Sequence, residues 1–362
     1  MNNPKFTRFL YDVNDVKYCL LMSLLEKNID DTIFWIYELY LYDKEICWNT
    51  IWEIFYDFYG LYNPKGEVMI TNFYNNGFHT IENLITICDN MVQWKSDPRI
   101  FLAHQAYKQV YPITSSYKGP VKLWIKNYDI KYRNLLRSLD KQNFYNVAYY
   151  LNALYTESKD DIYNIFKTIC SFYSKQKGFT VKEGVYEHLL NDNPYKNKIH
   201  IVLAVTMYLT IDDSKINNTN HKYCSTEDEL GILKLIDNFK GLKVNNVLQT
   251  KRIPINNNIY TFKRNNINSH KWTENINYCS WWKRKIEKYN GIIQENTIEF
   301  NSSKSSEKFY KRFDYLKDNS INIIDINTVS VDYTKNWTTW IHDYFKDYKN
   351  DMPFPTQFHF IL

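Results

Sequence analysis

Apolar residues recur at helical spacing from about Asp12 to Leu209, and this periodicity constrains the fold more than any other feature of the chain. The first predicted helix carries its apolar stripe at Leu20, Leu21, Leu24 and Leu25. A second helix, capped by Asp30 or Asp31, is followed by a third that runs from near Asn49 to about Gly60. Further helices are expected near residues 80–94, 98–110, 129–137, 140–155, 159–175, 181–190 and 198–209.

These helices are joined by short turns, and none can bury its apolar face alone. The sequence therefore predicts a mainly α fold of stacked antiparallel helix pairs, as in a helical-repeat array or an irregular bundle. The polar, Asn-rich stretch that begins at Ile211 interrupts this pattern. We place a helical domain at 1–210, a linker or exposed loop at 211–224, and a smaller, mixed α/β and basic C-terminal domain at 225–362.

The C-terminal domain mixes two periodicities. Residues 253–263 and 292–300 alternate like strands, whereas 225–239, 281–289, 307–315 and 337–348 have helical spacing.

The chain has no apolar stretch of the ~20 residues that a membrane-spanning helix needs. Its first residues do not resemble a signal peptide, so we expect a cytoplasmic protein. Its six cysteines are widely spaced without a Cys-x-x-Cys pair, which is typical neither of a zinc ribbon nor of a disulfide framework. We expect reduced, mostly buried thiols.

The charge is distributed unevenly along the chain. Residues 1–100 carry a net charge of −6, whereas residues 241–290 carry +8. The basic segment interleaves cations with aromatic residues, which is the composition of a surface that binds RNA or DNA. The predicted nucleic-acid-binding residues are Lys251, Arg252, Lys263, Arg264, Lys271, Trp272, Trp281, Lys283, Arg284 and Lys285. The alternative is that the aromatic residues form core and the cations a solvated face.

Two aromatic groups are candidate contacts for a protein partner. Trp35, Trp48 and Trp52 belong to a cluster more aromatic than a short helix pair requires, so part of it is a candidate exposed anchor. The C-terminal segment 352–362 is apolar and contains two prolines. Its Phe354, Phe358 and Phe360 are candidate contacts of a docking peptide. Core packing is the alternative for the tryptophans, and docking on its own domain is the alternative for the C-terminal segment.

A search for catalytic motifs finds no phosphate-binding loop, no dinucleotide fingerprint and no Gly-x-Ser-x-Gly elbow. The eight histidines never lie four residues apart on one helix, so no helical zinc pair is predicted, although a metal site assembled from distant residues stays open. Asp325, Asp332 and Lys335 faintly resemble a metal-dependent nuclease. We predict no catalytic residue, metal ligand or cofactor, and therefore a non-enzymatic protein.

Three N-terminal blocks resemble an uncharacterised family of the nucleocytoplasmic large DNA viruses, the giant viruses: Cys19 to Glu26, Phe34 to Tyr40 and Phe55 to Tyr59. A later block, at 282–286, 298–300 and 307–310, is similar to the C-terminal signature of that family. The resemblance implies a viral protein located in the host cytoplasm, at the virus factory, or in the virion. It implies no activity and no functional residue.

Together these features favour a helical scaffold or adaptor of a giant virus. The acidic, aromatic N-terminal half would hold a protein partner, and the basic segment would bind RNA or DNA, in viral transcription or translation. The alternatives are a structural or assembly protein of the virion and a nuclease that uses Asp325 and Asp332.

Overall fold

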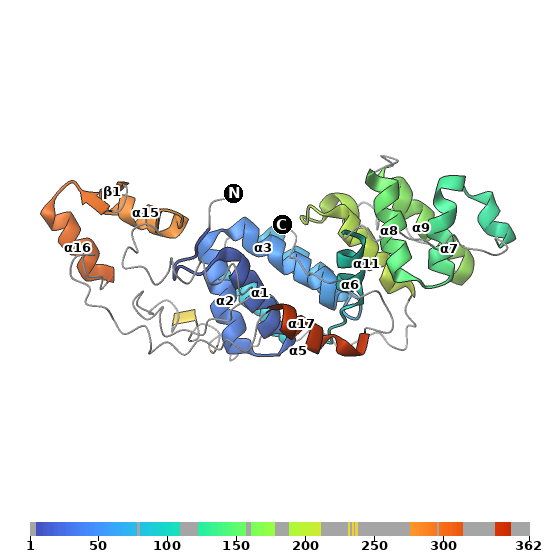
Figure 1. Cartoon of the computed structure of the whole chain (residues 1–362), viewed down its shortest axis with the longest axis horizontal. Helices are drawn as coiled ribbons and strands as arrows, with labels where there is room; N and C mark the ends of the chain where they lie inside the picture. Colours follow the sequence, from blue (N-terminus) through green and yellow to red (C-terminus); the bar gives the residue numbers. More distant parts are fainter. Residues whose placement is uncertain are drawn as a thin grey trace.

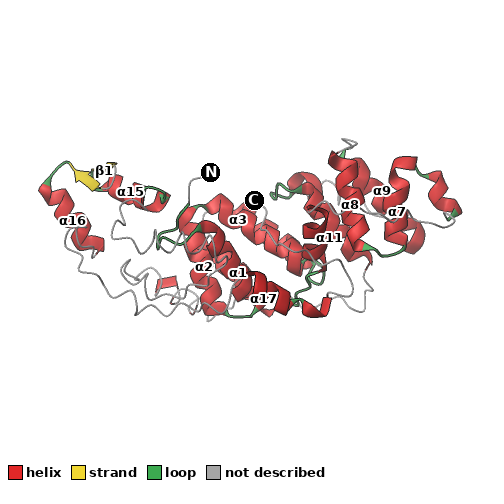
Figure 2. Cartoon of the chain, in the orientation of Figure 1, coloured by secondary structure: helices red, strands yellow, loops and turns green. Residues whose placement is uncertain are grey.

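The computed structural model describes residues 5–77, 80–108, 122–156, 161–177, 188–210, 276–294, 297–313 and 337–348, together with residues 231, 234, 236 and 237. The described residues are mostly helical, which confirms the mainly α prediction (Figures 1 and 2). The predicted linker at 211–224 and the predicted strand at 253–263 lie outside these ranges.

The helices of the N-terminal part pack on one another, most extensively α1 on α2 and α6 on α8, followed by α2 on α5 and α7 on α8. Its helices are α1 (Val13–Leu25), α2 (Ile29–Tyr42), α3 (Lys44–Ile54), α4 (Lys65–Gly77), α5 (Ile81–Gln93), α6 (Arg99–Lys108), α7 (Arg133–Asp140), α8 (Phe144–Thr156), α9 (Ile162–Lys177) and α11 (Lys198–Thr210). Short 3-10 or π turns are η1 (Phe55–Tyr59), η2 (Leu123–Asn127), η3 (Ile130–Tyr132) and η4 (His188–Asp192).

The C-terminal part contains a small two-stranded antiparallel sheet between two helices, which confirms its mixed character. Its elements are α15 (Ser280–Lys288), β1 (Gly291–Gln294), β2 (Thr297–Phe300), α16 (Ser303–Phe313), α17 (Trp337–Tyr344) and the 3-10 turn η9 (Lys346–Tyr348). In the hairpin, Gly291 pairs with Phe300 and Gln294 pairs with Thr297. The predicted strand-like run at 292–300 is therefore two strands.

Two helices begin earlier than the sequence predicts. The cap of α2 is Asn28, whose side chain accepts a hydrogen bond from the Asp31 N–H at 3.1 Å, and Asp30 and Asp31 lie in the first turn. The third helix begins at Lys44, because Asp43 caps it by accepting from the Ile46 N–H at 2.9 Å. Asn and Asp are both favourable N-cap residues. In a chain rich in both, the sequence alone does not decide which of several neighbouring Asn and Asp residues caps a helix.

The tryptophans predicted as a candidate exposed anchor lie in the core instead. Trp35, Trp48 and Trp52 are 4%, 1% and 1% exposed. Trp48 and Trp52 project from α3 into the interior, where Trp52 stacks on Tyr56 at 5.7 Å between ring centroids. Burying a large aromatic side chain between helices removes much apolar surface from water, and this outweighs leaving it as an anchor.

Helix α11 connects two groups of helices, together with the direct packing of α6 on α8. Helix α11 contacts η1 and α6 on one side and α8 and α9 on the other. Figure 1 shows α11 between the α1–α6 group and α7–α9. Helix α17 packs on α1, where the Trp340 Nε1 donates to Glu26 Oε1 at 2.7 Å and the Tyr344 hydroxyl donates to the Leu25 carbonyl at 2.9 Å. None of the helices in the described ranges combines the length and apolar character needed to cross a membrane.

Glycine at position 66 permits a close approach of α4 to two aromatic rings. A Cβ there would lie 2.7 Å from Trp94 and 2.8 Å from Phe55. Because both rings are rigid and buried, we expect Gly66→Ala to cost about 1–3 kcal/mol of unfolding free energy, measured by urea denaturation. Gly60→Ala is the control, because its Cβ would meet atoms no closer than 3.5 Å. Equal stability of the two variants would contradict this account of the packing.

Candidate functional site

The structure describes four of the ten predicted nucleic-acid-binding residues. Trp281, Lys283, Arg284 and Lys285 all lie on α15. The other six, Lys251, Arg252, Lys263, Arg264, Lys271 and Trp272, lie outside the described residues. The candidate surface is therefore built here from α15 and from the elements that pack against it.

Helices α15 and α16, with the hairpin between them, form a compact unit that we call the basic module (residues 280–313). It carries eight Lys and Arg against four Glu. Seven of the eight cations are exposed: Lys283, Arg284, Lys288, Lys304, Lys308, Lys311 and Arg312. Within the described ranges, none of these cations forms an ion pair with a carboxylate. These seven exposed cations could therefore bind an anionic ligand.

The cations of the two helices lie near enough to repel one another. Burial lowers the pKa of the half-buried Lys285 ammonium. Three neighbouring charges lower it further, those of Lys288, Arg284 and Arg312. Since Arg312 belongs to α16, the positive charge of α15 continues across the helix pair. Repulsion of this kind is relieved when phosphates bind.

An aromatic core lies beneath the charged face. Trp282 is fully buried, and its ring centroid lies 5.1 Å from that of Phe313 and 6.2 Å from that of Phe309. Trp281 is half-buried, with the Lys285 ammonium 5.1 Å from its ring centroid. Trp282 thus belongs to the core, as the alternative interpretation of the sequence expected, while the cations form the accessible face.

The basic module and the two residues before it, Tyr278 and Cys279, are attached to the N-terminal segment by three hydrogen bonds. The Phe6 N–H donates to the Tyr278 carbonyl at 3.1 Å, the Cys279 thiol to the Thr7 carbonyl at 3.2 Å, and the Trp282 Nε1 to the Arg8 carbonyl at 2.9 Å. These bonds join segments separated by more than 270 positions. They hold α15 in a defined place beside α2, which it contacts.

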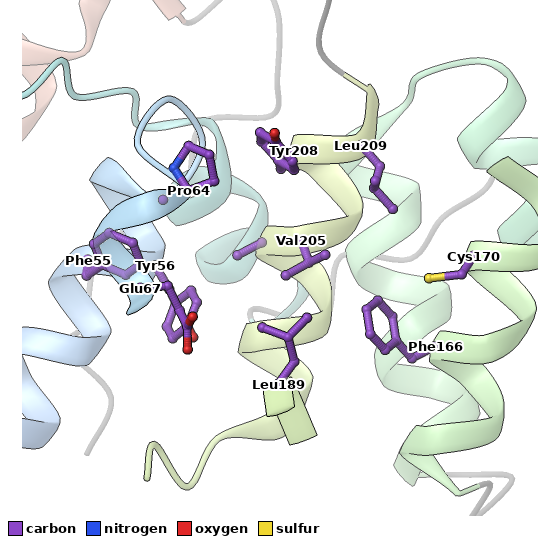
Figure 3. A pocket seen from close by; sticks show the side chains of 12 residues that line it. Phe55, Tyr56, Pro64, Glu67, Phe166, Cys170, Leu189, Val205, Tyr208 and Leu209 are labelled. Carbon is purple, nitrogen blue, oxygen red and sulfur yellow. The ribbon is translucent and has the colours of Figure 1, made fainter. Parts of the chain in front are cut away.

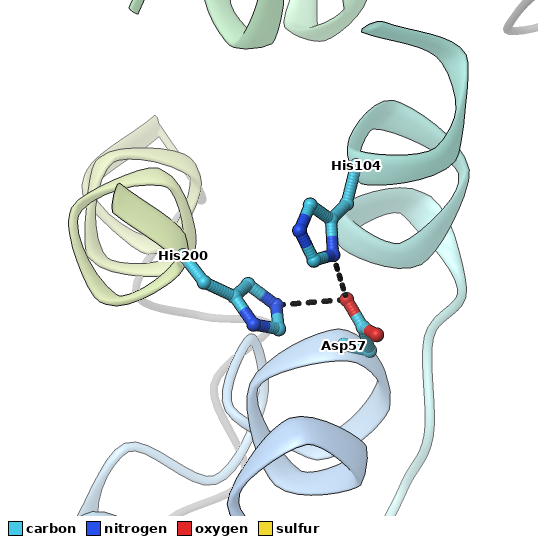
Figure 4. Close-up of side chains that lie close together, drawn as sticks. All are labelled: Asp57, His104 and His200. Atoms are coloured by element: carbon cyan, nitrogen blue, oxygen red, sulfur yellow. Dashed lines mark hydrogen bonds and ion pairs between the residues drawn. The ribbon is translucent and has the colours of Figure 1, made fainter. Parts of the chain in front are cut away.

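A second cluster lies in the interior, where Asp57, His104 and His200 come together (Figure 4). Asp57 projects from the π turn η1, His104 from α6 and His200 from the first turn of α11. Asp57 Oδ1 lies 3.2 Å from His104 Nδ1 and 2.8 Å from His200 Nε2. The three residues are at most 1% exposed. A π turn at a functional position is common, because the extra residue redirects one side chain.

Aromatic rings and one hydroxyl fix this cluster in place. The two imidazole rings stack with centroids 4.1 Å apart. The Tyr195 hydroxyl lies 3.0 Å from His200 Nδ1, which leaves His200 Nε2 directed at Asp57. Burial alone would raise the pKa of Asp57, but the charges of His200 and His104 and their hydrogen bonds outweigh it and hold this pKa below its usual range. The cluster therefore keeps a buried carboxylate ionised.

An apolar cavity of about 240 Å³ lies beside η1 and α11 (Figure 3). Its lining includes Tyr56, Phe166 and Val205, with Glu67 as the one carboxylate among the lining residues. Glu67 is held by Asn193, which donates to Glu67 Oε1 at 2.8 Å and to the Tyr56 hydroxyl at 2.7 Å. Asp57, His104 and His200 do not line this cavity.

The remaining predicted site residues lie outside the described part of the chain. These are the partner-binding Phe354, Phe358 and Phe360 and the nuclease-like Asp325, Asp332 and Lys335. The sequence did not predict the Asp57–His104–His200 cluster, because its members are 47 and 96 positions apart and carry no local motif. Comparison with protein-family models, curated proteins and solved structures gives no match for the chain.

Proposed function

We propose that the chain is a helical, non-enzymatic scaffold that binds RNA or DNA through the basic module. The observation that supports this proposal is the set of exposed cations on α15 and α16, which lie on an aromatic core and have no carboxylate partners among the described residues. The viral origin, a role in transcription or translation and the existence of a protein partner stay predictions from the sequence.

Phosphate binding accounts for this arrangement better than a solvated charged face does. Like charges on a folded surface repel one another and lower the free energy of unfolding. A bound polyanion would neutralise these cations and remove that repulsion. Lysine and arginine side chains on two adjacent helices can reach successive phosphates along a nucleic-acid backbone. Binding then releases condensed counterions and becomes steeply dependent on salt.

The test is a fluorescence-anisotropy titration of the full chain with single-stranded RNA and with duplex DNA at several salt concentrations. The triple variant Lys283→Gln, Lys288→Gln and Lys308→Gln removes three exposed charges and leaves the buried core untouched. Each lost phosphate contact lowers the salt slope by about 0.7–0.9, so we expect binding about a hundredfold weaker near 0.1 M salt and a flatter slope.

The matched control removes the same charge from the other end of the molecule. Lys126, Lys141 and Lys167 are exposed residues of η2, the turn before α8, and α9. Their triple replacement by glutamine should leave most of the affinity in place. Equal losses in the two triple variants would show that net charge alone governs binding, and absence of salt-dependent binding in the unaltered chain would refute the proposal.

A further inference from the structure

We propose that Asp57, His104 and His200 bind one divalent transition-metal ion of the zinc class in a fully buried site. The inference stands apart from the basic module and rests on the geometry of the buried cluster. Two imidazole nitrogens and one carboxylate oxygen converge there from three separate elements, and their ligand atoms all lie within 4.8 Å of one another. No motif in the sequence assigns this site.

The spacing of the donor atoms suits a small divalent cation. In a tetrahedral zinc site with bonds of about 2.0–2.1 Å, neighbouring ligand atoms lie about 3.3 Å apart. The carboxylate oxygen lies 3.2 Å from His104 Nδ1 and 2.8 Å from His200 Nε2. Small outward movements of the side chains would therefore place an ion among the three atoms. Three protein ligands leave a further coordination position for water or another ligand.

The donor set also matches the chemistry of zinc. Imidazole nitrogen and carboxylate oxygen are both common zinc ligands, and calcium or magnesium would prefer oxygen alone. His200 has the support that zinc-binding histidines usually have. Its other ring nitrogen, Nδ1, lies 3.0 Å from the Tyr195 hydroxyl, so Nδ1 can donate its proton to Tyr195 while Nε2 offers a lone pair to the ion.

The carboxylate is not fully satisfied by the two histidines. Both imidazoles approach the same oxygen, Asp57 Oδ1 (Figure 4). The other oxygen, Oδ2, is buried and accepts no hydrogen bond from the described residues. A carboxylate in such a place is costly unless a strong positive charge compensates for its lost hydration. A divalent ion beside it supplies that charge.

The position of the cluster indicates what the ion does. It lies where η1, α6 and α11 meet, and α11 also contacts α8 and α9. An ion bound there would join the two groups of helices that α11 connects. Because the three ligands are at most 1% exposed, the ion would be enclosed as the helices assemble, so its binding would stabilise the fold.

The decisive experiment uses the full unaltered chain. Metal content is measured after purification, and the chain is then stripped with a chelator and titrated with Zn²⁺ and with Co²⁺. We expect one ion per chain, a higher thermal midpoint with metal, and d–d absorption bands from Co²⁺. X-ray absorption at the zinc edge should report two imidazole ligands and no sulfur, which separates this site from binding at the buried cysteines.

Variants locate the ion. His104→Gln and Asp57→Asn should abolish the Co²⁺ bands, whereas Tyr195→Phe should keep the fold and weaken zinc binding about ten- to hundredfold by removing the support of His200. His188→Gln is the matched control, because His188 pairs with Glu67 at 3.2 Å and is not one of the three converging residues.

Two results would overturn the proposal. One is a chain that neither retains nor takes up an ion with imidazole ligands, in which case the three residues form a hydrogen-bonded network alone. The other is full metal binding by His104→Gln. Should the ligand variants fail to fold, the absorption spectrum of the unaltered chain and the Tyr195→Phe affinity still decide the question.

Discussion

Replacing Glu38 with alanine is expected to lower the unfolding free energy by about 3–5 kcal/mol. Glu38 is fully buried in α2, and the Arg8 guanidinium donates to its Oε1 through Nε at 3.0 Å and Nη2 at 2.9 Å. The Phe9 N–H donates to Oε2 at 3.2 Å. Alanine would remove the carboxylate that neutralises a buried guanidinium and leave that charge uncompensated.

The measurement is urea denaturation followed by circular dichroism. The control is Glu45→Ala, which breaks an exposed ion pair with Lys196 and should change the denaturation midpoint little. The double variant Arg8→Met with Glu38→Leu removes both charges and should recover much of the lost stability, because the cost lies in the uncompensated charge. A Glu38→Ala midpoint equal to that of Glu45→Ala would contradict the buried ion pair.

The helices could be predicted from the sequence because their period is local. Leu20, Leu21, Leu24 and Leu25 lie within two turns, and the structure buries all four in α1. The same holds for α11, predicted at 198–209 and found at Lys198–Thr210. Local spacing determines which face of a helix is apolar, and burying that face supplies most of the stability of the helix.

The exposure of aromatic residues could not be predicted in this way. Trp281 and Trp282 are adjacent in the sequence, yet one is half-buried and the other is fully buried. The difference depends on the residues that pack against Trp282, among them Arg8 and Phe309, which are distant along the chain. Tertiary contacts of this kind decide between core and surface, and composition does not record them.

The histidine–aspartate cluster lay beyond sequence reasoning for a related reason. Asp57 lies in the aromatic run Phe55–Tyr59, where helical spacing gives no indication that one residue faces inward to meet two histidines. The π turn redirects this stretch, and the positions of α6 and α11 bring in the other two residues. A metal motif with fixed local spacing would have been visible, but a site assembled from three distant elements is not.

Replacing Trp282 with alanine should cost about 3–5 kcal/mol and release the basic module from the N-terminal segment. The indole fills the space between α15 and α16, and its Nε1 donates to the Arg8 carbonyl at 2.9 Å. Alanine would leave a large cavity and remove that hydrogen bond. Because this side chain makes a hydrogen bond that joins residues 280–313 to residues 6–8, both segments should become more open to solvent.

Hydrogen exchange measured by mass spectrometry distinguishes local release from global unfolding. In Trp282→Ala, exchange should rise in residues 280–313 and in the segment around Arg8, while α7–α9 stay protected. Trp281→Ala is the matched control, since its half-buried indole should cost less. Trp282→Phe retains most of the apolar volume and should lose only about 1–2 kcal/mol for the missing hydrogen bond.

If Trp281→Ala destabilised the chain as much as Trp282→Ala, the indole of Trp282 would not be the anchor. Nucleic-acid binding should fall in Trp282→Ala even though every cation is present, because the module could no longer hold α15 and α16 side by side.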